Sequence, residues 1–547
     1  MQLCTPDGQQ GKLCFARHVI SISGLHVTLI AALLAWAAGG IWRRVPRLAL
    51  RLPAQKVALL AGVLAAAGYV LLAGSGVPAQ RTLYMLAVAA LALWLERGAG
   101  ATRVMALALL VVLLIDPWAV LAAGFWLSFG AVGALLLMAN AVPEQAGVGH
   151  WLLNWLRAQW AVTLFTLPML LGLFQQFSLV SPLVNAIAIP LISIVITPLA
   201  LLFALLPLPS LAEFANWLLG WLMGFLHWMA QLPLAVWQQA APPFWLVAVC
   251  CVAALWAFLP RGVPARWIGL LSFLPLLAWT PLRPGAGEVQ LTVLDVGQGL
   301  AVHVRTAGHD LLFDTGPQYS PETDAGERIV IPYLRAVGTP RLDRLVVSHD
   351  DNDHAGGADS LLAEYPVASW RSSLPDMHAL RMFPVPHQPC RRGERWEWDG
   401  VGFELLHPFD DFSGSDNEIS CVLRIETVAG AILLTGDIEQ RAEAALLAQG
   451  PGKLQATLVV APHHGSRSSS TPDFVAATGA RSVVFTAGYR NRFHHPAQEI
   501  VARYVHGGAS PYRSDQDGAI VFSFGVAGIA VRRERSVQQR YWHDRTD

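Results

Sequence analysis

The sequence predicts a polytopic helical membrane bundle followed by a soluble α/β domain, in which two packed sheets are flanked by helices. The 547 residues are 54% hydrophobic and 14% charged, which is too apolar for a soluble protein of this length. Long apolar runs recur up to about residue 282, whereas short alternating segments follow from about Glu288. We therefore divide the chain into a membrane half, residues 1–285, and a soluble half, residues 286–547.

The zero net charge conceals an asymmetry between the two halves. Residues 1–285 hold 14 basic and 5 acidic side chains, a net charge of +9, and residues 286–547 hold 24 basic and 33 acidic ones, a net charge of −9. An acidic soluble half argues against a surface that coats DNA non-specifically, because such affinity comes from Lys and Arg neutralising phosphates. Bound divalent cations would offset part of this negative charge locally.

The six cysteines predict neither a zinc site nor a disulfide framework. Cys250 and Cys251 lie inside an apolar run, and Cys390 and Cys421 are far apart in the sequence. We therefore expect the cysteines to have no structural role.

About ten apolar runs are expected to cross a membrane, which takes roughly 17 to 25 residues each. Two of them, at 102–115 and 158–178, are shorter or more polar than the rest. The other eight lie at 18–41, 56–76, 80–96, 118–140, 182–206, 211–235, 243–259 and 264–281. The first run is too long for a signal peptide, and no cleavage-like site follows it.

Positive charge after the first run sets the expected orientation. The basic cluster Arg43, Arg44, Arg47, Arg51 and Lys56 should be cytoplasmic, because short loops rich in Lys and Arg stay inside. If all ten runs span, the basic loops near 97–103 and 261–266 are also cytoplasmic, and the soluble half lies outside. Residues 1–17 then lie outside too, directly before a span, so we expect further domains to precede them.

Polar side chains in the membrane half indicate a path through the bundle. His26, Asp116 and Asn185 lie within or beside apolar runs. Such groups are unfavourable in lipid and are tolerated where they face a bundle interior or an aqueous cavity. Each alone could make an interfacial or interhelical hydrogen bond, but together they favour a polar path.

Alternating apolar residues predict strands throughout the soluble half, with three helices between them. The helices are expected at 324–337, 439–448 and 472–478. The strands are expected at 289–295, 301–306, 310–314, 344–348, 402–406, 420–427, 431–435, 457–461, 482–486 and 519–524.

Potential metal ligands gather where the predicted strands end. A strand holds the backbone fixed, and the loop after it can converge side chains on an ion. Two nearby divalent ions need a bridging carboxylate plus His and Asp, and this set supplies both. The alternative is that these acidic loops are only solvated. It could explain any one of these residues, but it does not explain the whole set. The residues are Asp314, His349, Asp351, Asp353, His354, Asp437, His463 and His464.

The run from His349 to His354 resembles the metal-binding signature of the metallo-β-lactamase superfamily. That signature, HxHxDH, is present here as HxDxDH. Asp351 stands where His is usual, and its hard oxygen donor should let one site tolerate Mn²⁺ or Mg²⁺ better than an all-imidazole site does. The resemblance implies an αβ/βα sandwich domain with two divalent metal ions, Zn or Mn.

The Asp-containing signature, with motifs at 417–423, 434–439, 462–466 and 491–496, resembles the C-terminal domain of the ComEC family of competence DNA-internalisation proteins. The membrane half resembles that family's competence domain at 20–27, at 116–117 with 124–129, and at 177–190. The implied fold class is a polytopic α-helical membrane bundle followed by an αβ/βα metallo-β-lactamase-like sandwich domain.

The chain departs from the family pattern at three points. The additional N-terminal spans and the OB-like periplasmic DNA-binding domain of the family are absent, so we expect a chain that is either truncated or given the wrong start. Leu300 stands where the family commonly has an acidic residue. A third-motif His is not obvious, and His407 is the best candidate, with a structural His in a turn as the equal alternative.

The resemblance implies roles for individual residues. Asp437 is the expected bridge between the metals, and Asp353 is expected both to bind metal and to orient the attacking hydroxide. One of His463 and His464 is expected to bind metal; we favour His464, with His463 in contact with substrate. His495 is expected to contact the scissile phosphate or only cap a turn. The expected metal ligands are His349, Asp351, Asp353, His354, His407, Asp437 and His464.

Three functions are compatible with these features. The leading one is an inner-membrane channel that imports single-stranded DNA in natural transformation, with a metal-dependent phosphodiesterase or nuclease outside the cytoplasm. The second is a membrane-anchored phosphoester hydrolase, and the third is a DNA channel with a degenerate metal domain. Because the sequence has no Walker-type motif, energy should come from a cytoplasmic ATPase or the proton gradient. The expected partners are single-stranded DNA, a periplasmic DNA receptor, that ATPase or single-strand-binding proteins, and the bilayer, with homo-oligomers left open.

Overall fold

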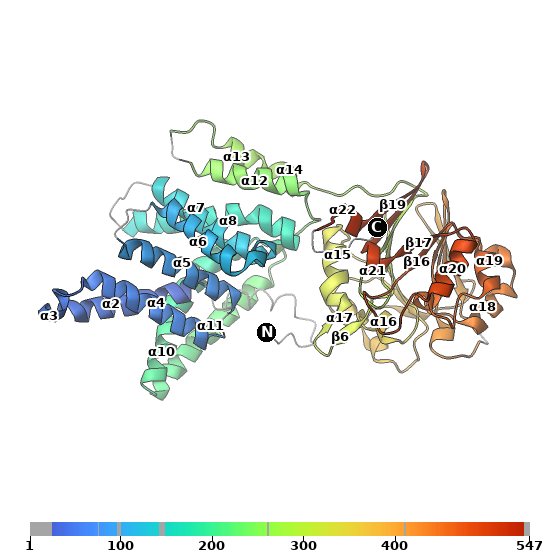
Figure 1. The fold of residues 1–547 in the computed structure, drawn as a ribbon, viewed down its shortest axis with the longest axis horizontal. Helices are drawn as coiled ribbons and strands as arrows, with labels where there is room; N and C mark the ends of the chain where they lie inside the picture. The colour runs from blue at the N-terminus through green and yellow to red at the C-terminus, as the bar shows by residue number, and fades with distance from the viewer. Residues whose placement is uncertain are drawn as a thin grey trace. The chain divides into compact units, whose positions relative to one another are not determined.

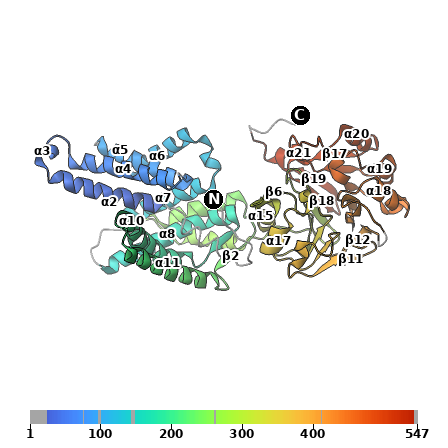
Figure 2. The same ribbon diagram turned by 90° about the horizontal axis from the view of Figure 1, so that it is seen from below.

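The computed structural model describes residues 24–74, 76–95, 100–141, 148–259, 262–409 and 412–540. Contacts within the chain divide it into two units that meet between Thr280 and Pro281, and each unit is described by itself (Figures 1 and 2). The predicted features at residues 18–23, 97 and 261 lie outside the described residues.

The membrane unit is a bundle of helices with one short two-stranded ribbon. Helices α2 and α4 lie side by side, with α3 at their turn (Figure 1). Its elements are α2 (Gly24–Arg43), α3 (Pro46–Ala49), α4 (Ala54–Leu72), α5 (Val77–Trp94), α6 (Ala101–Ile115), η1 (Pro117–Leu121), α7 (Ala123–Ala141), α8 (Val148–Phe174), β1 (Gln176–Ser178), α9 (Ser181–Pro190), η2 (Leu191–Ile196), α10 (Thr197–Leu205), α11 (Pro209–Ala230), β2 (Val236–Gln238), α12 (Phe244–Ala257), α13 (Ile268–Leu271) and α14 (Phe273–Leu277).

Five helices in the described part of the chain are long and apolar enough to cross a membrane, against about ten expected spans. They are His26–Arg43, Ala54–Leu72, Val77–Trp94, Leu153–Phe174 and Ser181–Phe203. Shorter apolar helices include Ala101–Ile115 and Phe244–Ala257, and the 22-residue α11 is not among the five.

The expected span at 264–281 is wrong as a single helix. Helices α13 and α14 have only four and five residues. Together they rise about 15 Å, half of the hydrocarbon core. Pro275 lacks an amide hydrogen, and Pro281 and Pro284 keep the following chain from continuing as helix. The number of spans therefore no longer places the soluble half outside the cytoplasm, because that placement required this run to cross the membrane.

The soluble unit is a sandwich of two mixed sheets. The order in the first sheet is β10 (His387–Pro389), β9 (Trp370–Ser372), β8 (Arg344–Val347), β5 (Asp310–Phe313), β4 (Val302–Arg305), β3 (Val289–Val293), β18 (Ile520–Gly525) and β19 (Gly528–Arg533). The order in the second is β11 (Arg395–Trp398), β12 (Val401–His407), β13 (Val422–Thr427), β14 (Gly430–Leu434), β15 (Leu458–Val460), β16 (Ser482–Phe485) and β17 (Ser510–Arg513). A separate pair is β6 (Gln318–Ser320) and β7 (Thr323–Asp324).

Helices cover both outer faces of the sandwich, with α15 and α17 on one side and α18, α19 and α20 on the other (Figures 1 and 2). The helices and helical turns are η3 (Gly326–Val330), α15 (Ile331–Ala336), α16 (Asn352–Ala355), α17 (Ala358–Glu364), η4 (Ala379–Met382), η5 (Asn417–Ile419), α18 (Gln440–Leu447), η6 (Pro451–Lys453), η7 (Pro462–Gly465), α19 (Pro472–Thr478), α20 (Gln498–His506), α21 (Ser514–Asp517) and α22 (Glu534–Val537).

Three buried apolar layers hold the sandwich together. Val302 and Phe313 of the first sheet meet Leu423 and Ile432 of the second between the sheets. A second layer lies under α15 and α17, and a third lies under α18, α19 and α20. Successive side chains of a strand point to opposite faces of its sheet, so every second residue faces the layer between the sheets. This produces the alternating pattern that predicted the strands. The predicted αβ/βα sandwich is confirmed.

A disulfide joins Cys390 to Cys421, so the expectation that the cysteines have no structural role is wrong. The two Cα atoms are 6.0 Å apart, although 31 positions separate the residues in the sequence. Cys390 follows β10 in the first sheet and Cys421 precedes β13 in the second, so the bond links the two sheets. Closing a loop of this length stabilises a fold by roughly 3 to 4 kcal/mol.

Candidate metal centre

The centre is built where neighbouring parallel strands end. In the first sheet β5 and β8 run parallel, so the loops that begin at Asp314 and His349 leave the same edge. In the second sheet β14, β15 and β16 run parallel, and their ends lead to Asp437, His463 and Thr486. Side chains far apart in the sequence therefore meet at one edge, where sites commonly form in sheets of this kind.

Asp314 organises the loop after β8 and is not in either group of potential ligands. Its carboxylate accepts hydrogen bonds from the Ser348 amide at 2.6 Å and the Ser348 hydroxyl at 2.8 Å. The same carboxylate lies 2.7 Å from Nδ1 of His354. A carboxylate that accepts from one imidazole nitrogen orients the ring and leaves the other nitrogen for a metal.

Two groups of potential ligands share one histidine. His349, His354 and Asp437 form the first group, and Asp353, His354 and His464 form the second. Within each group the ligand atoms lie within 4.8 Å of one another.

Asp437 reaches both groups through its two carboxylate oxygens. Its Oδ1 is 3.0 Å from Nε2 of His354, and its Oδ2 is 3.5 Å from Nε2 of His464. His464 is also 3.2 Å from Oδ2 of Asp353. The Asp437 carboxylate therefore lies between His354, which both groups share, and His464 of the second group.

The donor set fits divalent metal ions. Nε2 of His349 is buried and has no hydrogen-bond partner in the described chain, although burial without a partner is unfavourable for such a group. Its Nδ1 is held by the Ser348 hydroxyl at 2.9 Å, and Oδ2 of Asp351 lies 3.4 Å from Nε2. Imidazole nitrogens together with carboxylates suit zinc and manganese.

The charges of the centre reinforce one another. Burial raises the pKa of Asp437, but His354 and His464 lower that pKa well below its ordinary value. Burial lowers the pKa of His354, but Asp437 and Asp314 raise it well above the ordinary value. Burial likewise raises the pKa of Asp353, and a hydrogen bond from His464 brings it down to about 2. The carboxylates are therefore ionised at neutral pH, as metal binding requires.

Three orienting residues escaped the sequence analysis. The Thr486 hydroxyl lies 2.9 Å from Nδ1 of His464, and Oε1 of Glu439 lies 3.1 Å from Nδ1 of His463. The Ser420 hydroxyl accepts from the Asp437 amide at 3.2 Å. Ser420 and Glu439 lie within the motifs at 417–423 and 434–439, and Thr486 ends a predicted strand, but none of them was assigned a role.

His463 and His464 form a tight turn in which both have positive φ, 49° and 53°. His464 is 2% exposed and belongs to the buried ligands, whereas the His463 side chain is 23% exposed and lies 3.8 Å from Asp437. The turn thus directs His464 into the centre and leaves His463 at its open side.

His407 is not brought to the centre. Its Nε2 lies 2.7 Å from the Glu418 carbonyl oxygen, and its ring packs edge-on against Phe409 and Phe412. Burial lowers the pKa of His407 to about 4. Neither ligand group contains His407. Its contacts match the alternative stated above, a structural histidine in a turn.

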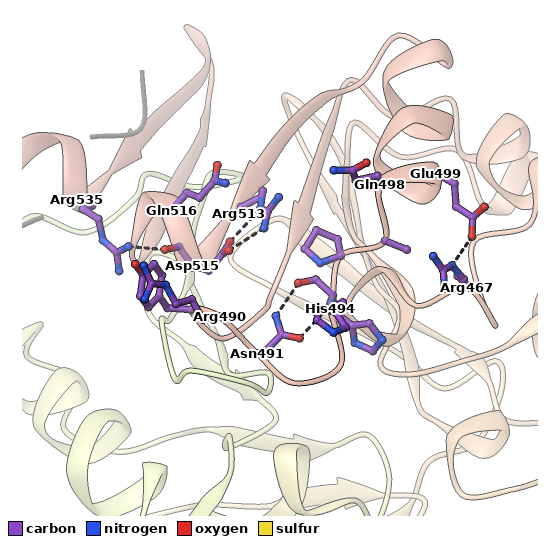
Figure 3. Close-up of a pocket in the computed structure, with 14 residues that line it drawn as sticks. Arg467, Arg490, Asn491, His494, Gln498, Glu499, Arg513, Asp515, Gln516 and Arg535 are labelled. Carbon is purple, nitrogen blue, oxygen red and sulfur yellow. Dashed lines mark hydrogen bonds and ion pairs between the residues drawn. The ribbon is translucent and has the colours of Figure 1, made fainter. Parts of the chain in front are cut away.

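Beside the centre lies a pocket of about 950 Å³ whose lining includes His495 (Figure 3). The rings of His495 and His464 are 6.4 Å apart. Burial, and then the charges of His464 and His463, lower the pKa of His495 to about 4, so its ring is neutral at pH 7. Asn491 holds the loop by donating to the His495 carbonyl at 2.7 Å.

The pocket is rich in arginine. It extends from the Arg467–Glu499 ion pair past His494 to Arg535 (Figure 3). Its charged lining consists of Arg467, Arg490, Arg513, Arg535, Glu499 and Asp515. The pocket is therefore net positive in a half of the chain with a net charge of −9.

One of the predicted polar residues of the bundle, Asp116, lies near a buried arginine that the sequence analysis missed. Arg81 on α5 is 5% exposed, and Asp116 acts on its charge. His26, near the start of α2, is 6% exposed, and α2 packs against α5. Asn185 instead donates to the Ser181 hydroxyl on its own helix at 3.0 Å.

Two families match successive parts of the chain. The family described as "Competence protein" matches residues 16–264, and the metallo-beta-lactamase superfamily matches residues 294–482. The second match agrees with the sandwich fold and implies metal binding.

Several relatives match nearly the whole chain. "Competence protein ComA" of Neisseria gonorrhoeae is 39% identical over 532 residues, which cover 96% of this chain and 73% of the relative. "Uncharacterized protein YcaI" of Escherichia coli is 32% identical over 542 residues, 96% of this chain and 69% of the relative. "Recombination protein 2" of Haemophilus influenzae is 29% identical over 540 residues, 89% of this chain and 65% of the relative. The chain therefore belongs to the ComEC family of competence proteins, as a multi-pass membrane protein with a metallo-β-lactamase domain.

Proposed function

We propose that the chain imports single-stranded DNA across the bacterial inner membrane in natural transformation, and that its metal domain hydrolyses phosphodiester bonds outside the cytoplasm. One observation carries the proposal: two ligand groups joined through His354 and Asp437 lie beside an arginine-lined pocket, in a chain that also has a membrane bundle. Family membership supports the link to DNA uptake, because relatives are named competence proteins.

The residues of the centre fit hydrolysis of a phosphodiester. His349, Asp351, Asp353, His354, Asp437 and His464 would hold two divalent ions, Zn or Mn. Such ions supply an activated water and neutralise charge on a phosphoryl group. Asp353 orients the attacking group, and His463 at the open side contacts the substrate.

The second site of substrate contact is the pocket. Guanidinium groups bind phosphate oxygens in a bidentate way, so arginines beside a metal centre favour a polyanionic substrate over a neutral one. Arg490 lies 5.0 Å above the ring of Tyr489, and aromatic rings in such grooves stack with nucleobases. The neutral His495 ring can contact the phosphate without adding charge.

The disulfide supports a place outside the cytoplasm for the soluble unit. Disulfides persist in oxidising compartments and are rare in the cytoplasm. The number of spans no longer supports an extracytoplasmic soluble unit by itself. The Cys390–Cys421 bond is now the main support for that orientation.

A reporter fused after Arg540 tests the orientation. Alkaline phosphatase at this position is expected to be active, because it needs an oxidising compartment to fold. β-Galactosidase at the same position should be inactive. The opposite pair of results would place the metal domain in the cytoplasm.

The proposal also names partners. A periplasmic receptor would deliver DNA, and a cytoplasmic ATPase or single-strand-binding proteins would draw the strand inwards, since the sequence holds no Walker-type motif. The arrangement is compatible with one chain or with a homo-oligomer.

The competing proposal makes the bundle only an anchor for a phosphoester hydrolase. The Asp116→Ala and Asn185→Ala variants separate the two, because an anchor does not need these polar groups. In a transformable strain that depends on this gene, each variant should lower DNase-resistant uptake of labelled DNA at least tenfold. Glu213→Ala and Asn216→Ala on exposed positions of α11 are the matched controls. Wild-type uptake by both polar variants, with normal protein levels, would favour the anchor.

A further inference from the structure

Arg81 is a buried cation, and two of its three guanidinium nitrogens have no hydrogen-bond partner in the described chain. It lies near the start of α5 and is 5% exposed, so it faces the bundle and not lipid. Its Nε and Nη1 atoms are buried without a hydrogen-bond partner among the described residues. A guanidinium carries five N–H donors, and leaving them unpaired away from water is unfavourable.

Asp116 balances this charge only from a distance. Its carboxylate accepts from the Trp118 amide at 3.1 Å and so caps η1. Asp116 acts on Arg81 electrostatically, but no ion pair within 4.0 Å joins Arg81 to any described carboxylate. Asp116 therefore compensates the charge of the Arg81 guanidinium from a distance, while its Nε and Nη1 donors can still bind a further acceptor.

The backbone around Arg81 is shaped to leave it room. A Cβ atom on Gly124, at the start of α7, would lie 2.7 Å from Nη2 of Arg81. A Cβ atom on Gly24, at the start of α2, would lie 2.2 Å from the hydroxyl of the neighbouring Thr82. Gly24, Asp116 and Gly124, each from a segment that the sequence analysis singled out, therefore lie around Arg81 and its neighbour Thr82, which it did not single out.

These groups lie at one end of the helices. The starts of α2, α5 and α7 and the end of α6 come together here, whereas the basic cluster at 43–56 follows the opposite end of α2. With that cluster in the cytoplasm, Arg81 lies at the outer end of the bundle. This assignment does not depend on the run at 264–281.

We propose that Arg81 is a phosphate-binding site at the outer entrance of the bundle, where it receives the backbone of the incoming strand. The inference rests on the proposed transport function. Arginine is suited to phosphate oxygens because its donors form a fixed fork. The negative charge of Asp116 weakens the binding of phosphate to Arg81, so that each phosphate can leave again. Conduction through multiple sites requires such release.

The alternative is that Arg81 and Asp116 are only a structural pair between helices. The two roles respond differently to removal of both charges. Breaking a buried pair by one substitution is strongly destabilising, whereas replacing both partners with neutral residues is often neutral or better. A structural pair is thus restored by the double change, and a phosphate site is not.

The test compares Arg81→Met, Asp116→Asn and the Arg81→Met/Asp116→Asn double variant of the full chain in a transformable strain that depends on it. Protein abundance in membranes and DNase-resistant uptake of labelled DNA are measured together. We expect the double variant to regain wild-type abundance while uptake stays at least tenfold below wild type. Arg81→Lys, which keeps the charge, should retain part of the uptake.

The matched control is Arg157→Met on α8, where the half-buried Arg157 donates to Asn154 at 3.3 Å. Its uptake should equal that of the wild type. Recovery of uptake by the double variant would overturn the phosphate site and leave the transport function standing. If deletion of the whole gene leaves uptake unchanged, the transport function itself is contradicted.

Discussion

The Asp437→Ala variant of the purified full-length protein is expected to lose metal-dependent hydrolysis of single-stranded DNA by more than about 100-fold. Substitutions that only disturb the orientation of a metal ligand typically cost 10–100-fold in affinity or activity. Asp437 does more, because it belongs to the first ligand group and its Oδ2 also lies 3.5 Å from His464 of the second. Its loss removes a negative charge from the first group and from beside the second.

Metal content explains the loss of activity in this variant. His354 belongs to both ligand groups, and Asp437 belongs to one and lies 3.5 Å from His464 of the other, so His354→Ala and Asp437→Ala should each reduce the bound metal from two ions per chain towards none. His464→Ala leaves the group of His349, His354 and Asp437 intact and should retain one ion. Elemental analysis after dialysis measures the difference.

The control is Asp359→Ala, which removes an exposed carboxylate from α17 close in sequence to the centre. Its activity and metal content should match the wild type, and thermal unfolding of all variants checks that they are folded. Unchanged hydrolysis by Asp437→Ala would refute the assignment of the centre. A wild-type protein that binds no metal would support the degenerate metal domain.

The sequence predicted candidate ligands because strand periodicity predicts where strands end. Five of them form the two groups of the centre, since loops after parallel strands converge at one edge, and Asp351 lies 3.4 Å from His349 without belonging to either group. His407 also ends a strand, β12, but it is hydrogen-bonded to Glu418. Position in the sequence cannot distinguish a strand end that faces the centre from one that does not.

Features set by tertiary contact left little trace in the sequence. Cys390 and Cys421 meet because two sheets pack together, and their spacing of 31 residues carries no such information. Arg81 lies near the start of the expected run at 80–96, and only its packing against α7 shows that it is enclosed.

The strands that escaped prediction are short or lie at sheet edges. β11 reads Arg-Trp-Glu-Trp and is half exposed, and β17 contains Pro511 at the edge of its sheet. Such strands need not alternate cleanly, because one side has no neighbour. The run at 264–281 failed for a different reason: it is apolar enough for a span, but its prolines interrupt the helix.

Passage of a single strand through the bundle is the largest effect expected in the membrane half. Purified full-length protein in liposomes should admit a labelled oligothymidylate when a single-strand-binding protein is trapped in the lumen, because binding inside holds each strand that enters. The Asp437→Ala variant is used so that the oligothymidylate is not hydrolysed during the assay. Protein-free liposomes show the background.

The direct measurement is therefore the amount of nuclease-protected oligothymidylate inside these liposomes. The proposed channel predicts accumulation several times above the protein-free background for Asp437→Ala, and a return to background when Arg81→Met/Asp116→Asn is added. Accumulation no greater than in protein-free liposomes, from folded protein inserted in the bilayer, would contradict a DNA channel.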